Sequence, residues 1–150
     1  PAPTAAAPVP SPTATSPSGA TCGTWPQLPG HVTLMRAGEV PIVTDLLDPA
    51  SPTVGVRFTT GVAGDVTAIR FYRAPSDQTT NVTGRLFDWL TEAPLASTAA
   101  MGSLACAGRW VSLPLVPAFR TVPGVEYVVA VDGLIVHSET EGLFAAGRTN

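Results

Sequence analysis

Charged residues are scarce in this chain, and lysine is missing altogether. Asp, Glu, Lys and Arg make up 13% of the 150 residues, and all eight basic residues are arginine. A typical soluble domain has roughly a quarter of its residues charged. The arginines are scattered from Arg36 to Arg148 and the net charge is −3. Because no clustered basic stripe is present, we expect no nucleic-acid partner.

Long apolar runs are also absent. The longest, Val125 to Val131, is interrupted by Glu126 and has the length of a strand. A membrane-spanning helix needs about 20 consecutive apolar residues, so we predict no transmembrane span. The chain begins at Pro1 without a Met or a signal peptide, which we interpret as a processed chain or an excised segment of an exported protein.

Motifs for catalysis and metal binding are lacking as well. His31 and His137 are the only imidazoles, neither belongs to a recognisable motif, and no serine lies in a Gly-x-Ser-x-Gly elbow. We therefore predict a protein that is not an enzyme, with no catalytic residue and no cofactor. Without paired cysteines or a His-x-Glu-x-x-His motif, we expect no zinc. The sequence does not exclude a structural calcium ion. Its candidate ligands in the loops are Asp132, Glu139 and Glu141, whose spacing is not diagnostic.

The chain contains only two cysteines, Cys22 and Cys106. In a cytosolic protein they would be free buried thiols, whereas an even number in an exported protein favours a disulfide. We predict the disulfide. In the chain-entropy model, a bridge that closes a loop of about 84 residues stabilises the fold by roughly 4 kcal/mol.

Proline and glycine, in contrast, are abundant, with 16 and 14 residues. The first twenty residues, PAPTAAAPVPSPTATSPSGA, are of low complexity, and no charge precedes Arg36. Such segments adopt extended polyproline conformations. We therefore predict a Pro/Ala/Ser/Thr-rich arm over residues 1–21, followed by a β-sandwich domain over residues 22–150. The arm is either an interdomain linker or a clamp that lies in a groove of a neighbouring subunit.

The rest of the chain consists of short β-rich runs separated by turn residues. Val54 to Tyr72 reads as a hairpin that turns at Gly61 to Gly64, and the best helix candidate is a single turn at Thr44 to Leu47. The other predicted strands are Arg85 to Trp89, Leu95 to Met101, Trp110 to Leu115 and Tyr127 to Val131. This spacing predicts an all-β protein with an antiparallel β-sandwich.

Aromatic residues offer the only signal for a ligand site. Sugar recognition needs flat aromatic faces beside hydrogen-bonding groups. If Phe87 points into the core, Trp89 shares its face and Asp88 points outward. If Leu86 is the core residue, Trp89 is exposed and becomes the best stacking candidate. We take Trp89, Tyr72 and Asp88 as candidate ligand-binding residues.

Several of these segments together resemble a bacterial family known as domain of unknown function 4082. They are Gly55 to Thr59, Val62 to Arg73, Thr83 to Phe87, Leu95 to Ala99, Gly108 to Val111 and Pro123 to Ala130, in this order. The resemblance covers roughly residues 32 to 137 and implies a jelly-roll-like sandwich from exported multidomain bacterial proteins, often beside carbohydrate-active or immunoglobulin-like domains. It implies no known catalytic residues. Phe87 stands where the family usually has Trp.

Two functions follow as hypotheses. The first is a non-catalytic exported binding module, extracellular or on the cell surface, whose partner is a polysaccharide or a cell-surface glycan. The second is a structural assembly protein, such as a virion decoration or surface-layer subunit, that clamps neighbouring protein subunits with its N-terminal arm.

Overall fold

The chain forms strands and no helix in the part that the structure describes. The computed structural model describes residues 19–23, 30, 32–35, 39–47, 53–102 and 106–139. The strands are β1 (Thr21–Cys22), β2 (Val43–Leu47), β3 (Val54–Thr59), β4 (Asp65–Arg73), β5 (Thr83–Asp88), β6 (Pro94–Ser97), β7 (Arg109–Arg120), β8 (Glu126–Asp132) and β9 (Val136–Glu139). All strand pairs are antiparallel, so the predicted all-β class is confirmed.

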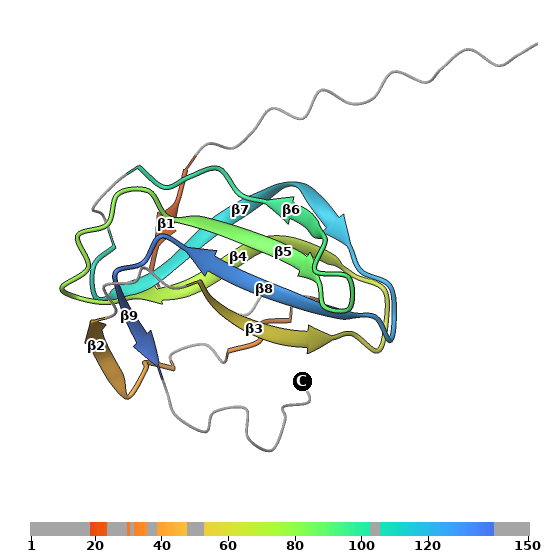
Figure 1. Ribbon diagram of the computed structural model, residues 1–150, viewed down its shortest axis with the longest axis horizontal. Coiled ribbons are helices and arrows are strands. Elements are labelled where there is room, and N and C mark those ends of the chain that lie inside the picture. Colours follow the sequence, from red (N-terminus) through yellow and green to blue (C-terminus); the bar gives the residue numbers. More distant parts are fainter. Residues whose placement is uncertain are drawn as a thin grey trace, which may run out of the picture.

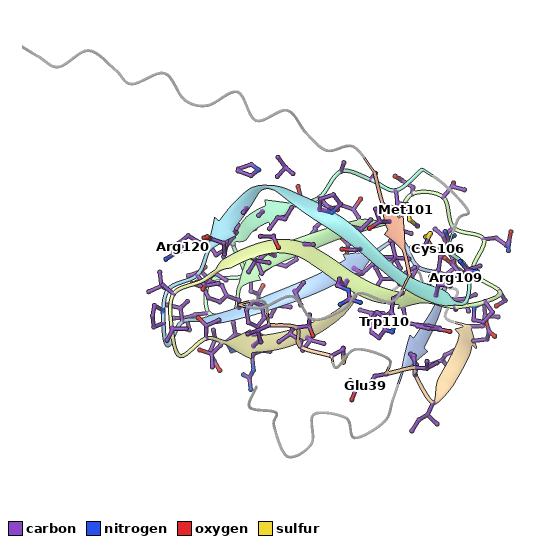
Figure 2. All side chains as sticks on the ribbon, turned by 180° about the vertical axis from the view of Figure 1, so that it is seen from behind. Glu39, Met101, Cys106, Arg109, Trp110 and Arg120 are labelled. Atoms are coloured by element: carbon purple, nitrogen blue, oxygen red, sulfur yellow. A yellow bond between two sulfur atoms is a disulfide. The ribbon has the colours of Figure 1, made fainter. Side chains whose placement is uncertain are left out.

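Two sheets pack face to face as a sandwich. A three-stranded sheet has the order β1-β7-β4, and a four-stranded sheet has the order β3-β8-β5-β6. The four-stranded sheet lies in front in Figure 1, whereas β4 and β7 lie in front in Figure 2, which shows the molecule from behind. A separate pair, β2 with β9, lies at one end. The predicted sandwich is therefore confirmed.

The core lies between the two sheets because apolar side chains alternate along the strands. In β4, Ile69 and Phe71 are buried, while the residues that follow each of them, Arg70 and Tyr72, point outward. Further core residues are Val82, Leu86, Met101, Val111, Leu113, Leu115, Val131 and Leu134. The two sheets pack closely at Gly84, where an added Cβ atom would lie 3.0 Å from the side chain of Ile69.

The predicted hairpin over Val54 to Tyr72 is wrong, although both of its strands exist. β3 pairs with β8 and β4 pairs with β7, so the two strands belong to opposite sheets. The loop between them is bonded to the loop that follows β7: Gly64 N donates to Thr121 Oγ1 over 3.1 Å, and Gly124 N donates to Thr60 O over 2.9 Å. Alternation shows which residues share a face but does not show which strand is the partner.

The helical turn predicted at Thr44 to Leu47 is also wrong. These residues lie in β2, which pairs with β9, a strand that the sequence pattern did not reveal. Intrinsic preference over so few residues is easily overridden by a partner strand from the other end of the domain. The strand predicted over Leu95 to Met101 ends at Ser97, and Met101 forms an isolated bridge with Val82.

Cys22 and Cys106 form the predicted disulfide, with a Cα–Cα distance of 5.3 Å. The bond joins β1 to the turn before β7, and Cys22 also pairs with Val111 of β7. The disulfide lies at the opposite end of the sandwich from Arg120 (Figure 2). Residues 1–18, which make up most of the predicted arm, lie outside the described residues.

Candidate functional site

The outward face of the four-stranded sheet carries an exposed tryptophan, paired charged residues and an open groove. The strand registers place one set of residues on this face, opposite to the core. They are Gly55, Arg57 and Thr59 of β3, Glu126, Val128, Ala130 and Asp132 of β8, Thr83, Arg85 and Phe87 of β5, and Ser97 of β6. We call this set the outer face.

Trp89 lies at one end of the outer face. Leu86 is fully buried, so the alternative in which Leu86 is the core residue and Trp89 is exposed is the correct one. Trp89 is 47% exposed. Its backbone N donates to Glu126 O over 3.1 Å. The guanidinium carbon of Arg57 lies 4.7 Å from the centre of the indole ring. This cation–π contact orients the ring over the sheet.

Charged side chains on the outer face are arranged as pairs of opposite sign. Arg57 Nε lies 3.9 Å from Glu126 Oε1, and Arg85 Nε lies 2.6 Å from Asp132 Oδ2. Thr53 Oγ1 also donates to Asp132 Oδ1 over 2.5 Å. These pairs are partly exposed to water, so each contributes only about 0–1 kcal/mol to stability. Their more important effect is electrostatic, because the positive charges of the two arginines are balanced by the negative charges of the two carboxylates.

An open groove lies beside β6, on the side of the outer face away from β3. Its lining comes from β5 and β6 and consists of Thr83, Arg85, Pro94, Leu95, Ala96 and Ser97. Arg85 and Ser97 are opposite each other in the strand pairing. The groove therefore combines two hydroxyl groups and one guanidinium with the apolar surface of Pro94 and Leu95.

Asp88, a predicted ligand-binding residue, fixes the turn that presents Trp89. Its Oδ1 accepts hydrogen bonds from Thr91 N at 2.8 Å, Thr91 Oγ1 at 2.9 Å and Leu90 N at 3.0 Å. These bonds, mainly those from Thr91, lower the pKa of Asp88 below the ordinary 3.8. The carboxylate thus acts on Trp89 through the backbone of the turn.

Tyr72, the third predicted residue, lies on the other sheet. It projects outward from β4, donates from its hydroxyl to Gly108 O over 2.7 Å and meets Trp110 edge-on at 5.7 Å. Trp110 Nε1 donates to Glu39 O over 2.6 Å, on the side of the molecule that Figure 2 shows. The structure therefore brings Asp88 together with Trp89 and leaves Tyr72 on the opposite face.

The polar residues around Trp89 were not predicted from the sequence. Arg57, Glu126, Arg85 and Asp132 come from three strands that are distant in the sequence. Alternation within β3 could have placed Arg57 opposite to the core. Its contact with Trp89 depends on the order of strands in the sheet, which alternation does not specify.

Metal-binding geometry is absent from the part of the chain that the structure describes. No group of three or more His, Cys, Asp or Glu residues could hold an ion there. Asp132, a calcium candidate, instead pairs with Arg85. The side chain of Glu139, all of Glu141 and His31, and the side chain of His137 lie outside the described residues. No helix among the described residues is long and apolar enough to cross a membrane.

The protein is an all-β sandwich domain with one disulfide between described residues. One face of its four-stranded sheet carries the exposed Trp89, which Arg57 contacts. The model of a family described as Domain of unknown function (DUF4082) matches residues 38–150, and the chain belongs to this family. The resemblance noted in the sequence is thereby confirmed. No curated protein and no solved structure matches the chain.

Proposed function

We propose that this domain is a non-catalytic binding module for a carbohydrate, either a polysaccharide or a cell-surface glycan, and that it works outside the cell. The observation that carries the proposal is the half-exposed Trp89 indole held over the sheet by Arg57. Sugar rings have apolar C–H faces that stack on indole, and their hydroxyls bond to neighbouring polar groups. The Cys22–Cys106 disulfide supports the location, because disulfides persist in oxidising compartments.

The surroundings of Trp89 favour binding over a purely structural role. The ring lies beside the sheet but outside the core, whose residues include its near neighbour Leu86. The backbone bond to Glu126 and the stacking of Arg57 fix the orientation of the ring before any ligand arrives. A side chain that is already ordered loses less conformational entropy on binding, which favours affinity.

Affinity electrophoresis tests the proposal. The protein is run in gels that contain soluble plant, chitin-like or bacterial cell-wall polysaccharides, beside its Trp89→Ala variant. We expect one class of polysaccharide to retard the protein and the substitution to abolish that retardation. Ile135→Ala is the matched control, because Ile135 is 44% exposed and follows the opposite end of β8. Equal migration of the protein in all gels, or unchanged retardation of Trp89→Ala, would overturn the proposal.

A structural assembly subunit is the second proposal, with neighbouring protein subunits as partners in a virion or surface layer. Its support is the disulfide, which fixes Cys22 and hence the point at which the N-terminal segment joins the sandwich. Deleting residues 1–20 should then abolish assembly in size-exclusion chromatography with light scattering and leave the circular dichroism spectrum unchanged. Assembly of the truncated chain would reject this function.

A further inference from the structure

The outer face carries Trp89 and the lining of the groove along the same strand, β5. Resting on the proposed function, we infer that its ligand is a linear, uncharged polysaccharide that lies along β5, from Trp89 to the end of the groove that Arg85 and Ser97 form. A site for a single sugar ring would need only Trp89 and its immediate neighbours. The features that follow extend well beyond them.

The first feature is the alternation along β5. Thr83, Arg85 and Phe87 project to the outer face, and Trp89 follows in the turn at the end of the strand. The groove begins at Pro94, opposite Phe87, and extends to Ser97, opposite Arg85. Trp89 and Arg85 are four residues apart, which is roughly 14 Å at about 3.4 Å per residue. A ligand that touches both Trp89 and the Arg85–Ser97 end of the groove therefore contains more than one sugar ring in an extended chain.

The second feature is the distribution of apolar and polar surface along this line. Phe87 and Val128, paired across β5 and β8, supply apolar surface between the two ends. At the groove end, Thr83 and Ser97 carry hydroxyls, and Arg85 carries a guanidinium. Apolar patches that alternate with hydrogen-bonding groups match a chain of sugar rings, which present C–H faces and hydroxyls in turn.

The third feature is the balance of charge, which selects among ligand classes. Arg57 is paired with Glu126, and Arg85 is paired with Asp132, so these four side chains carry no net charge. An anionic polymer or an anionic lipid surface would meet two carboxylates as well as two guanidinium groups, and both ligands require an excess of cations. The paired groups can still donate to and accept from neutral hydroxyls.

Titration with an oligosaccharide ladder tests the inference. The probes are β-1,4-linked glucose, N-acetylglucosamine and xylose oligomers from disaccharide to hexasaccharide, and binding is measured by calorimetry and by Trp fluorescence. We expect the affinity in the bound series to rise roughly tenfold or more from disaccharide to hexasaccharide, as added rings reach the groove. We expect Arg85→Ala and Ser97→Ala to weaken hexasaccharide binding and to leave disaccharide binding unchanged.

A matched control separates the groove from a general loss of charge. Arg120 is exposed and pairs with Asp65 at 3.1 Å on the other sheet, so Arg120→Ala should leave the affinity for every oligomer unchanged. Equal affinity for disaccharide and hexasaccharide, with no effect of Arg85→Ala, would overturn the elongated site and leave the proposed function standing. Failure of every oligomer and polysaccharide to bind would overturn both. Binding of a protein partner that Trp89→Ala and Arg85→Ala both weaken, without any sugar binding, would replace the ligand class.

Discussion

Arg73 and Asp77 form an ion pair inside the sandwich, with Arg73 Nε donating to Asp77 Oδ2 over 2.9 Å and both side chains fully buried. Arg73 Nη2 also donates to the carbonyl oxygens of Asp77 at 3.3 Å and Thr79 at 2.5 Å. Asp77 Oδ1 in turn accepts from the Thr79 backbone N at 3.1 Å and from the Thr79 hydroxyl. These bonds hold the loop between β4 and β5 in one conformation.

Breaking this pair should be costly because it would leave a buried arginine without its carboxylate. We expect Asp77→Ala to lower the free energy of unfolding by about 3–5 kcal/mol. Asp65→Ala, which removes the partner of Arg120 in an exposed pair, should lower it by less than about 1 kcal/mol. Urea unfolding followed by fluorescence measures both variants. Equal losses for Asp77→Ala and Asp65→Ala would contradict a structural role for the buried pair.

Gly84 provides a test of the packing between the two sheets. The Cβ atom of an alanine at this position would lie 3.0 Å from three atoms of Ile69, including its Cβ. We expect Gly84→Ala to lower the free energy of unfolding by about 1–3 kcal/mol, the usual cost of overpacking a core. Gly61→Ala is the control, because an added Cβ there meets no atom within 4 Å. If the two variants were equally stable, the close approach at Gly84 would not limit the side chain.

Removing the disulfide should destabilise the domain strongly. The bond between Cys22 and Cys106 spans 84 residues, and closing a loop of this size contributes roughly 4 kcal/mol in the chain-entropy model. We expect Cys22→Ser/Cys106→Ser to lose about this amount in urea unfolding, and the wild-type protein with reductant to behave in the same way. A thiol assay on the denatured wild-type protein should detect no free thiol from these cysteines. Reaction of both would show that the bridge does not form.

Acid should weaken the turns that Asp45 and Asp88 hold. Asp45 Oδ1 accepts from the Ser76 hydroxyl at 2.6 Å and the Ser76 backbone N at 2.9 Å, and these bonds lower its pKa below 3.8, as Thr91 does for Asp88. Because the folded-state pKa is lowered, the contribution to stability is complete above the unfolded-chain pKa of about 4. It is lost as pH falls through the lower folded-state value.

The measurement is the free energy of unfolding as a function of pH, from neutral down to about pH 2. We expect Thr91→Val and Ser76→Ala each to reduce the loss of stability in the acid range, because the carboxylate pKa then returns toward its unfolded value. NMR titration of the two carboxyl carbons checks the direction of each shift. A pKa at or above 3.8 for Asp88 in the folded wild-type protein would refute this explanation.

Sequence patterns located most strands of the sandwich but not their partners. In the sequence of β4, Ile69 and Phe71 alternate with Arg70 and Tyr72, and Ile69 and Phe71 are the buried pair, because burial follows the period of the strand. The same alternation could not separate a hairpin from two strands in opposite sheets. For Trp89, the sequence left two registers open, and the burial of Leu86 decides between them.

The sequence also could not predict which residues meet on the outer face, because this depends on which strands are neighbours in the sheet. Arg57 lies in β3 and Trp89 follows β5, and only β8 between these strands brings them together. Likewise, the contact of Arg85 with Asp132 requires β5 and β8 to be neighbours. Long-range strand order depends on how both sheets bury their apolar faces together, and a single sequence contains no local signal for it.

The disulfide also determines how the domain would respond to being pulled from its N-terminal side. β1 contributes only two residues to its sheet, and such a short strand would peel away under a small load. A covalent bond at Cys22 diverts the load to Cys106 and from there into β7, the central and longest strand of its sheet. Force applied on the N-terminal side would therefore act on β7, which pairs with β4 from Arg109 to Arg120, and not on the two residues of β1 alone.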